Sequence, residues 1–454
     1  MNNIDELTID KLHEMYKNKR VSVKEVVLEY LNRIDHYDQG PGKLNAILEL
    51  NPDAVKIAEG MKLDKLDSEN SLFGVPILLK DNMDTKDGMH TSAGSLALAD
   101  SFAKEDAVIV KKLRDKGAVI LGKTNMTELS NYTSKDMTPG YSSRGGIVYS
   151  PYVKVQNPSG SSTGSAVAVA ANLCMAAMGT DTSGSVVEPG KVNGIVGFRP
   201  SIHALSQKGI IPISFTLDTA GPLTRTVKDT IVLYSALHDT VTDISNQDIS
   251  NTIIAVDETS MSALTQEDNK RVSTIIETLK DAKATVKRIK LPQIATDVLE
   301  RIKLHEFKYS INCYLKRLPD GFPIRSLSDI IHFNDQHKEI ALRYGQSMLL
   351  NAEMNTTGDM DNKQYKEAIA GRETMKVQIA ELLEGVDVCM FFGQNLIFQY
   401  VGLPIITIPH GLNNDGMPFG VFLSALRDDT LLKKSHLLEG YIGNRVCPDL
   451  TKFL

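Results

Sequence analysis

The sequence predicts an α/β fold, and three observations support this prediction. Amphipathic segments with helical spacing alternate with short apolar segments typical of buried strands along most of the chain. A predicted helix at 106–116 is followed directly by a predicted strand at 118–122, which is the helix-to-strand step of a mostly parallel sheet. The 454 residues, 42% of them hydrophobic, are also enough to bury a large core.

The N-terminal region, residues 1–70, is predicted to be helical and to serve packing. Ser22 and Glu25 form a capping-box pattern, and apolar residues follow at helical spacing, so we expect an amphipathic helix from Ser22 to about Asp38. Asn51 followed by Pro52 predicts a second helix, with asparagine as its N-cap and proline at its first position.

A short apolar segment, 73–79, ends abruptly at Lys80. We expect a buried strand that carries Lys80 at its carboxyl end, because sites in open α/β sheets lie at the carboxyl ends of strands. For most lysines the simpler interpretation is better, namely that the side chain leaves the core for solvent. The position of Lys80 alone therefore does not separate a structural role from a functional one.

The most distinctive stretch runs over residues 157–200. Two loops rich in serine, threonine and glycine, at 159–165 and 179–185, bracket an apolar run from Ala166 to Met178 that predicts one helix. Glycine permits close backbone approach, and a loop that leads into a helix presents unpaired N–H groups, which suits an anion or a developing oxyanion. The alternative is a pair of ordinary turns. Spacing alone makes the two interpretations about equal.

Alternating elements continue toward the C-terminal end. Residues 291–360 differ, because they are mostly helical, charged and rich in aromatic side chains. We expect them to form a helical layer over one face of the sheet, or a wall or lid beside the site. The remaining predicted elements are strands at 194–198, 252–256, 387–392, 404–409 and 419–423, and helices at 227–237, 267–282 and 362–384.

Composition and charge argue against some classes of function. The net charge of −6 gives no reason to expect a nucleic-acid partner. The four cysteines are scattered and form no CxxC pair, so neither a zinc site nor a disulfide framework is predicted, and a reducing, cytoplasmic setting fits best. The N-terminus lacks the features of a signal peptide, and no apolar run approaches about 18 residues, so we expect a soluble protein without a membrane partner.

Three further patterns have less weight. Residues 160–164 fit GxSxG, which would make Ser162 the nucleophile of a hydrolase elbow, but the preceding segment is polar and broken by proline. The segment 184–191 resembles a phosphate loop, yet its spacing is one residue too long and Val192 stands where serine or threonine is required. His332 and His337 are five positions apart, which does not align two metal ligands on one helix face. We therefore expect no metal.

Three blocks of sequence together resemble the amidase signature family. They are 74–82, which reads GVPILLKDN, 159–171, which reads SGSSTGSAVAVAA, and 179–185, which reads GTDTSGS, and their order and separation match the family. Further matching segments, at 122–125, 209–212, 218–222 and 402–409, extend the resemblance over nearly the whole chain. Segments 141–146 and 185–189 are most similar to the peptide-amidase-like branch.

The resemblance implies an architecture for the chain. It implies a single amidase-signature domain over residues 1–454, with a large, mixed, twisted sheet covered by helices on both faces. In this arrangement the N-terminal region 1–70 is helical, and the helical layer at about 291–360 lies near the substrate entrance.

Carried over by position, Lys80, Ser161 and Ser185 match the family's lysine, cis-serine and nucleophilic serine. The resemblance implies that Ser185 attacks an amide carbonyl while Ser161 passes its proton to a neutral Lys80, without metal or cofactor. An acyl-enzyme forms, and water hydrolyses it. Lysine can accept this proton only if desolvation lowers its pKa from about 10.4 toward neutrality, and the apolar segment before Lys80 offers such a setting. A cis bond before a non-proline residue costs about 2.5–4 kcal/mol, and Gly160 reduces the crowding there.

The residues around Ser185 match the family's oxyanion loop. Thr182, Ser183 and Gly184 are expected to direct N–H groups at the tetrahedral oxyanion, an effect of about 3–4 kcal/mol per donor. Ser162 and Asp181 are expected to hold the proton relay from behind, although ordinary loop hydrogen bonding explains these two residues equally well.

Several positions depart from the family pattern. Ser183 replaces a frequent glycine, and Val187 stands where many members have an arginine, which argues against binding of an acidic substrate group at that point. Gly190 and Lys191 replace small residues after the proline, and the segment 392–402 is short for the branch. These changes concern substrate fit more than the triad.

The expected function is therefore hydrolysis of a carboxamide, with a small-molecule or peptide amide as the substrate and a homodimer left open as the assembly. One alternative is an amidotransferase A-type subunit that releases ammonia from glutamine inside a complex, against which Val187 and the branch match argue. The other is a non-catalytic binding protein that keeps the fold. A scaffold has no physical need for Lys80, Ser161 and Ser185 together.

Overall fold

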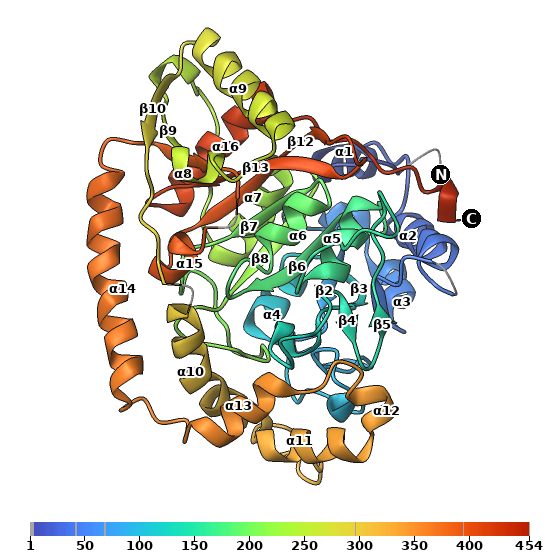
Figure 1. Ribbon diagram of the computed structural model, residues 1–454. Helices are drawn as coiled ribbons and strands as arrows, with labels where there is room; N and C mark the ends of the chain where they lie inside the picture. The colour runs from blue at the N-terminus through green and yellow to red at the C-terminus, as the bar shows by residue number, and fades with distance from the viewer. Residues whose placement is uncertain (1–3, 41–42, 68–69, 296, 394, 454) are drawn as a thin grey trace.

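The computed structural model describes residues 4–40, 43–67, 70–295, 297–393 and 395–453. In these residues, eleven strands form one mixed sheet in the order β1-β3-β2-β6-β8-β7-β12-β13-β11-β9-β10 (Figure 1). Their bounds are β1 Ile47–Leu50, β2 Pro76–Lys80, β3 Val119–Thr124, β6 Ala176–Asp181, β7 Val196–Arg199, β8 Thr219–Thr224, β9 Ile253–Asp257, β10 Thr285–Ile289, β11 Val388–Phe391, β12 Ile405–Leu412 and β13 Pro418–Ser424. Strands β4 (Tyr141–Ser142) and β5 (Gly146–Ile147) form a separate antiparallel pair.

Helices cover both faces of the large sheet, which confirms the predicted α/β class (Figure 1). Their bounds are α1 Ile9–Lys17, α2 Val23–Tyr37, α3 Ala54–Gly60, α4 Val108–Asp115, α5 Thr163–Ala170, α6 Val187–Val192, α7 Val227–His238, α8 Glu258–Met261, α9 Gln266–Asp281, α10 Val298–Leu315, α11 Leu327–Gln336, α12 Lys338–Ala341, α13 Ser347–Asn355, α14 Lys363–Leu382, α15 Ile397–Val401 and α16 Asp428–Ile442. Within the described part of the chain, no helix combines the length and the apolar character that a membrane span requires.

Strands β2 and β6 position the site. They run parallel to each other, with Leu79 paired to Met178, and every residue of both strands is buried. Because the carboxyl ends of parallel strands meet at one edge of the sheet, Lys80 at the end of β2 and Asp181 at the end of β6 lie at the same edge. The prediction that a buried strand delivers Lys80 to a carboxyl end is confirmed.

The apolar run from Ala166 to Met178 does not form the single helix that the sequence predicts. Helix α5 ends at Ala170, and Asn172 adopts a left-handed conformation with φ of 55° that turns the chain back. The residues from Ala176 then form strand β6, because β2 and β8 on either side supply the hydrogen-bond partners of a ladder. Alanine and methionine favour a helix by intrinsic propensity, so the long-range pairing overrides the local preference.

Other elements match their predictions, with boundaries that differ by a few residues. Ser22 and Glu25 form both hydrogen bonds of a capping box at the start of α2. The helix predicted at Asn51 and Pro52 begins later, with Asp53 as its N-cap. The Asn51 side chain instead donates to the Ile120 carbonyl, which ties this turn to strand β3.

The N-terminal and 291–360 segments both contain the expected helices. The N-terminal segment also contributes the edge strand β1, which pairs with β3. Helices α10, α11 and α13 lie below the sheet in Figure 1 and share a hydrophobic cluster with residues from segments 93–132 and 211–213. Phe307 and Ile311 of α10 are completely buried in this cluster.

Candidate active site

Lys80 is the only predicted site residue with a side-chain amine, and its Nζ atom is enclosed by protein. The side chain has no exposed surface. Its Nζ lies 2.8 Å from Ser161 Oγ and 2.8 Å from Thr180 Oγ1. Burial lowers the pKa of Lys80 to about 7, and the more distant carboxylates of Asp181 and Asp218 only partly oppose this shift. A substantial fraction of this lysine is therefore neutral near pH 7.

Ser161 contacts Lys80 from the glycine-rich loop. It follows Gly160 through a cis peptide bond, and its own side chain is completely buried. The Thr127 N–H donates to the Ser161 carbonyl at 3.1 Å, which fixes the backbone here. The hydroxyl of Ser161 is therefore held in place beside the lysine amine.

Ser162 supports the lysine from a second direction. Its Oγ lies 3.1 Å from Lys80 Nζ, donates to the Thr180 carbonyl at 3.1 Å and accepts from the Thr180 N–H at 3.2 Å. A Cβ at Gly179 would meet Ser162 Oγ at 2.6 Å, so only glycine allows this approach to β6. Ser162 is completely buried, which is inconsistent with an exposed elbow nucleophile.

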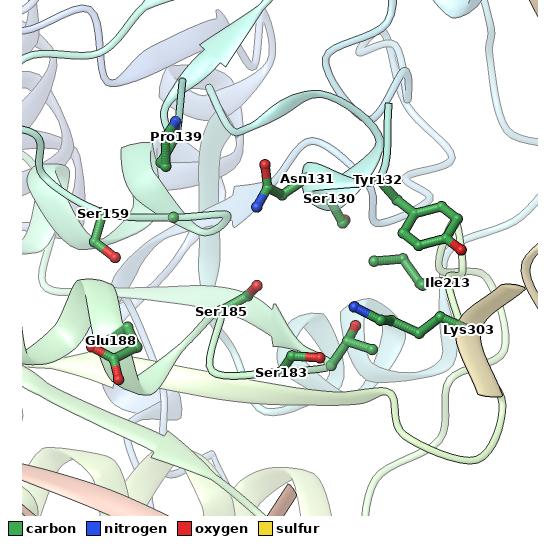
Figure 2. Close-up of a pocket in the computed structure, with 12 residues that line it drawn as sticks. Ser130, Asn131, Tyr132, Pro139, Ser159, Ser183, Ser185, Glu188, Ile213 and Lys303 are labelled. Atoms are coloured by element: carbon green, nitrogen blue, oxygen red, sulfur yellow. The ribbon is translucent and has the colours of Figure 1, made fainter. Parts of the chain in front are cut away.

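Ser185 lines a cavity of about 280 Å³ that Figure 2 shows in close-up. The Ser162 N–H donates to the Ser185 carbonyl at 3.1 Å, so the two serine loops are joined directly. The cavity is lined by Ser130, Asn131, Tyr132, Pro139, Ser159, Gly160, Thr182, Ser183, Ser185, Glu188, Ile213 and Lys303. The structure thus brings both loops together at one cavity, with the buried lysine in contact with the first of them.

The segment from Thr182 to Ser185 forms a wall of this cavity. In the described part of the chain, the N–H groups of Thr182, Ser183 and Ser185 have no protein acceptor, whereas the Gly184 N–H donates to Asp181 Oδ1 at 2.9 Å. Gly184 has a φ of 106°, a conformation that a side chain disfavours. Two of the three predicted oxyanion donors are therefore free, and the third is engaged with Asp181.

Asp181 anchors this loop. Its Oδ2 accepts from the Val186 N–H at 2.8 Å, and its Oδ1 accepts from Arg199 at 2.8 Å, in an ion pair with no exposed side-chain surface. Arg199 also donates to the Asp181 carbonyl at 2.7 Å. Because a buried charge needs a partner and hydrogen bonds, this pair holds the loop ahead of α6 in one conformation.

Sequence reasoning missed three polar residues around the site. Thr180 lies inside the motif at 179–185, and Asp218 is the first residue of the matching segment 218–222. The motifs could therefore have identified both residues. Asp218 accepts from Thr182 Oγ1 at 2.7 Å, and burial raises its pKa to about 6. Arg199 lies outside every matching segment, so only its contact with Asp181 identifies it.

Comparison with known proteins places the chain in a family. The family model described as Amidase matches residues 25–392. A probable amidase of Arabidopsis thaliana is 35% identical over 93% of this chain and 87% of its own length. The chain belongs to the amidase family.

Solved structures of the amidase family extend the comparison. The native peptide amidase from Stenotrophomonas maltophilia superposes with a TM-score of 0.89 at 30% identity, covering 98% of this chain and 99% of that one. An amidase family protein from Bacillus anthracis superposes with a TM-score of 0.90 at 31% identity, covering 98% and 92%. Among the relatives found by sequence, the A-type subunit of the glutamyl-tRNA(Gln) amidotransferase of an Exiguobacterium strain is 30% identical over 97% of this chain and 98% of its own length. The family match and the peptide amidase neighbours support an amide-hydrolysing enzyme.

The structure shows where the residues at 187–191 that differ from the family pattern are located. Val187 is buried in a hydrophobic cluster and does not line the cavity. Glu188, the next residue, lines it instead. Lys191 points away to the Phe392 carbonyl, to which it donates at 2.6 Å. The charged residue that α6 presents to the cavity is therefore an acid.

Proposed function

We propose that this amidase hydrolyses a carboxamide through Ser185, Ser161 and Lys80. The single observation that carries the proposal is the buried Lys80 Nζ, 2.8 Å from Ser161 Oγ, with a pKa lowered to about 7. A neutral amine beside a serine hydroxyl is a base, and a serine is a weak nucleophile until a base removes its proton. Ser185 lines the cavity, so a substrate can reach this residue.

The proposed reaction has two stages that use the same proton path. Ser185 Oγ bonds to the amide carbon as its proton passes to Ser161 Oγ, which gives its own proton to Lys80 Nζ. The path then returns the proton to the amide nitrogen, the C–N bond breaks, and ammonia or an amine leaves an ester on Ser185. Water then attacks the ester carbon as its proton passes through Ser161 to Lys80, and the path returns that proton to Ser185 Oγ as the bond between this oxygen and the acyl carbon breaks, which releases the carboxylic acid.

We assign the oxyanion to the loop that precedes Ser185. The free N–H groups of Thr182 and Ser183 suit the charge that develops on the carbonyl oxygen, and each is worth about 3 kcal/mol in a preorganised site. Gly184 contributes its backbone conformation, and its N–H fixes the loop through Asp181. Ser162 and Asp181 take the supporting roles that the family pattern implies.

A fluorophosphonate probe tests the nucleophile, because it phosphonylates activated serines. We expect labelling and ammonia release from an amide panel in the wild type, and neither in Ser185→Ala. Ser159→Ala is the matched control, since Ser159 also lines the cavity but has no part in the proton path. Equal labelling of wild type and Ser185→Ala would remove Ser185 from the mechanism.

The second candidate is an amidotransferase A-type subunit, which the 30% identity over almost the full chain to the Exiguobacterium protein favours. Such a subunit works on glutamine inside a complex, whereas the peptide amidase likeness favours a free hydrolase. Co-purification with a second protein, together with glutamine-specific ammonia release that depends on it, would support the second candidate. A non-catalytic binding role predicts no fluorophosphonate labelling at all.

A further inference from the structure

Two side chains of opposite charge line the cavity on either side of Ser185. Glu188 comes from α6, and Lys303 comes from α10, which is more than a hundred positions away in the sequence. Figure 2 shows Ser185 between them, with the Nζ end of Lys303 directed into the cavity. A substrate that reaches Ser185 therefore extends between a negative and a positive group.

The Glu188 carboxylate is without a partner in the described part of the chain. No hydrogen bond or ion pair there includes its oxygens. Lys191, the cation that acts on Glu188, donates to the Phe392 carbonyl and lies over the Phe422 ring at 4.9 Å. Asp181, the acid that acts on Glu188, is paired with Arg199. Burial raises the pKa of Glu188, and a cationic group beside it would favour its charged form.

Such a carboxylate is unusual for a packing residue. Glu188 is only partly buried, and it lines the cavity, where a charge without a protein partner is stabilised by water or by a ligand. Every other feature of Glu188 is ordinary: it lies in the first turn of α6, and its N–H donates to the Gly184 carbonyl at 2.9 Å. Its place on the wall of the cavity that contains Ser185, together with the unpartnered carboxylate, is what points to a ligand.

Lys303 has capacity for a ligand as well. It forms an ion pair with Glu300 one turn earlier on α10 and lies 5.7 Å from the Tyr132 ring centroid. An ammonium has three donors, so this pair leaves donors for an oxygen of the substrate. The positive charge also makes that end of the cavity unfavourable for a second cation.

We propose that the amide substrate carries a cationic amino group, which pairs with Glu188, while Lys303 donates to an oxygen at the other end of the molecule. The substrate class is thus amino-substituted carboxamides, such as amides of amino acids and short peptides with a free amine. This inference rests on the proposed function for the reaction, and it concerns which amide is chosen.

The test compares two amides of matched length, 5-aminopentanamide and hexanamide, in which a methyl group replaces the ammonium. Calorimetric affinities are measured with Ser185→Ala, which retains the cavity, and with the double variant Ser185→Ala/Glu188→Gln. We expect the cationic amide to bind at least about tenfold more tightly than the neutral one, and this ratio to fall toward one in the double variant. The matched control is the double variant Ser185→Ala/Glu367→Gln, in which an exposed acid of α14 is replaced. Its affinity ratio should equal that of Ser185→Ala.

The outcomes separate the two proposals. Equal affinities for both amides in Ser185→Ala, weaker binding of the cationic amide, or a ratio that survives Glu188→Gln would overturn the cation site. Binding of neither compound would overturn it too. None of these results bears on labelling of Ser185 by the fluorophosphonate, and a failure of that labelling leaves the affinity ratio as an independent result.

Discussion

Replacing Lys80 with methionine tests the central physical claim, that burial keeps this lysine uncharged near neutral pH. Methionine has a similar length and no charge, so it retains most of the packing in a site with no exposed surface. It cannot accept a proton from Ser161. We expect Lys80→Met to lose amide hydrolysis, and we also expect a characteristic change in the pH dependence of stability.

The magnitude follows from the lysine pKa. Burial lowers it from 10.5 to about 7, and at about 1.4 kcal/mol per pKa unit the folded chain carries a cost of about 5 kcal/mol at pH 7. Between these two pKa values the unfolded chain binds the proton and the folded chain does not, so stability rises with pH. Between about pH 7.5 and 9.5 the wild type should gain roughly 3 kcal/mol relative to Lys80→Met.

The assay is urea unfolding followed by circular dichroism at several pH values in that window. Lys287→Met, at an exposed position of β10, is the matched control and should follow the wild type. The absolute stability of Lys80→Met is less informative, because the hydroxyls of Ser161 and Thr180 lose a partner. Curves for wild type and Lys80→Met that stay parallel from pH 7.5 to 9.5 would refute a neutral buried lysine.

Three further predictions follow from the same geometry. Because the base must be deprotonated Lys80, kcat/KM for an amide should rise with pH through about 7 and then level off, and a profile that is flat from pH 6 to 8 contradicts this role. Arg199→Met leaves Asp181 as a buried, unpaired charge and should destabilise the fold by about 3–5 kcal/mol; an unchanged melting temperature argues against the anchor. Thr182→Val removes the hydrogen bond to Asp218 and should lower kcat by about tenfold or more, with recovery in Thr182→Ser. Equal kcat values for these two Thr182 variants would show that the hydroxyl does not position the loop.

Local patterns in the sequence were sufficient for much of the fold. The capping box at Ser22 and the apolar segment before Lys80 predicted the correct helix and the correct strand, because caps and short buried runs depend on nearby residues. The run from Ala166 to Met178 could not be divided by the same reasoning. Its many alanines favour a helix by intrinsic propensity, and the pairing with β2 and β8 overrides that preference from Ala176 onward.

In the candidate site, too, some features follow from the sequence and others depend on long-range contacts. The sequence by itself determined which residue types stand at Lys80, Ser161 and Ser185, and the order of motifs that links them to the amidase family. Only the tertiary structure decided that Lys80 is desolvated, that Arg199 holds Asp181, and that Glu188 and Lys303 face one cavity. Spacing along a chain sets local conformation, whereas burial and charge pairing depend on groups that meet only when the sheet and its helices have packed.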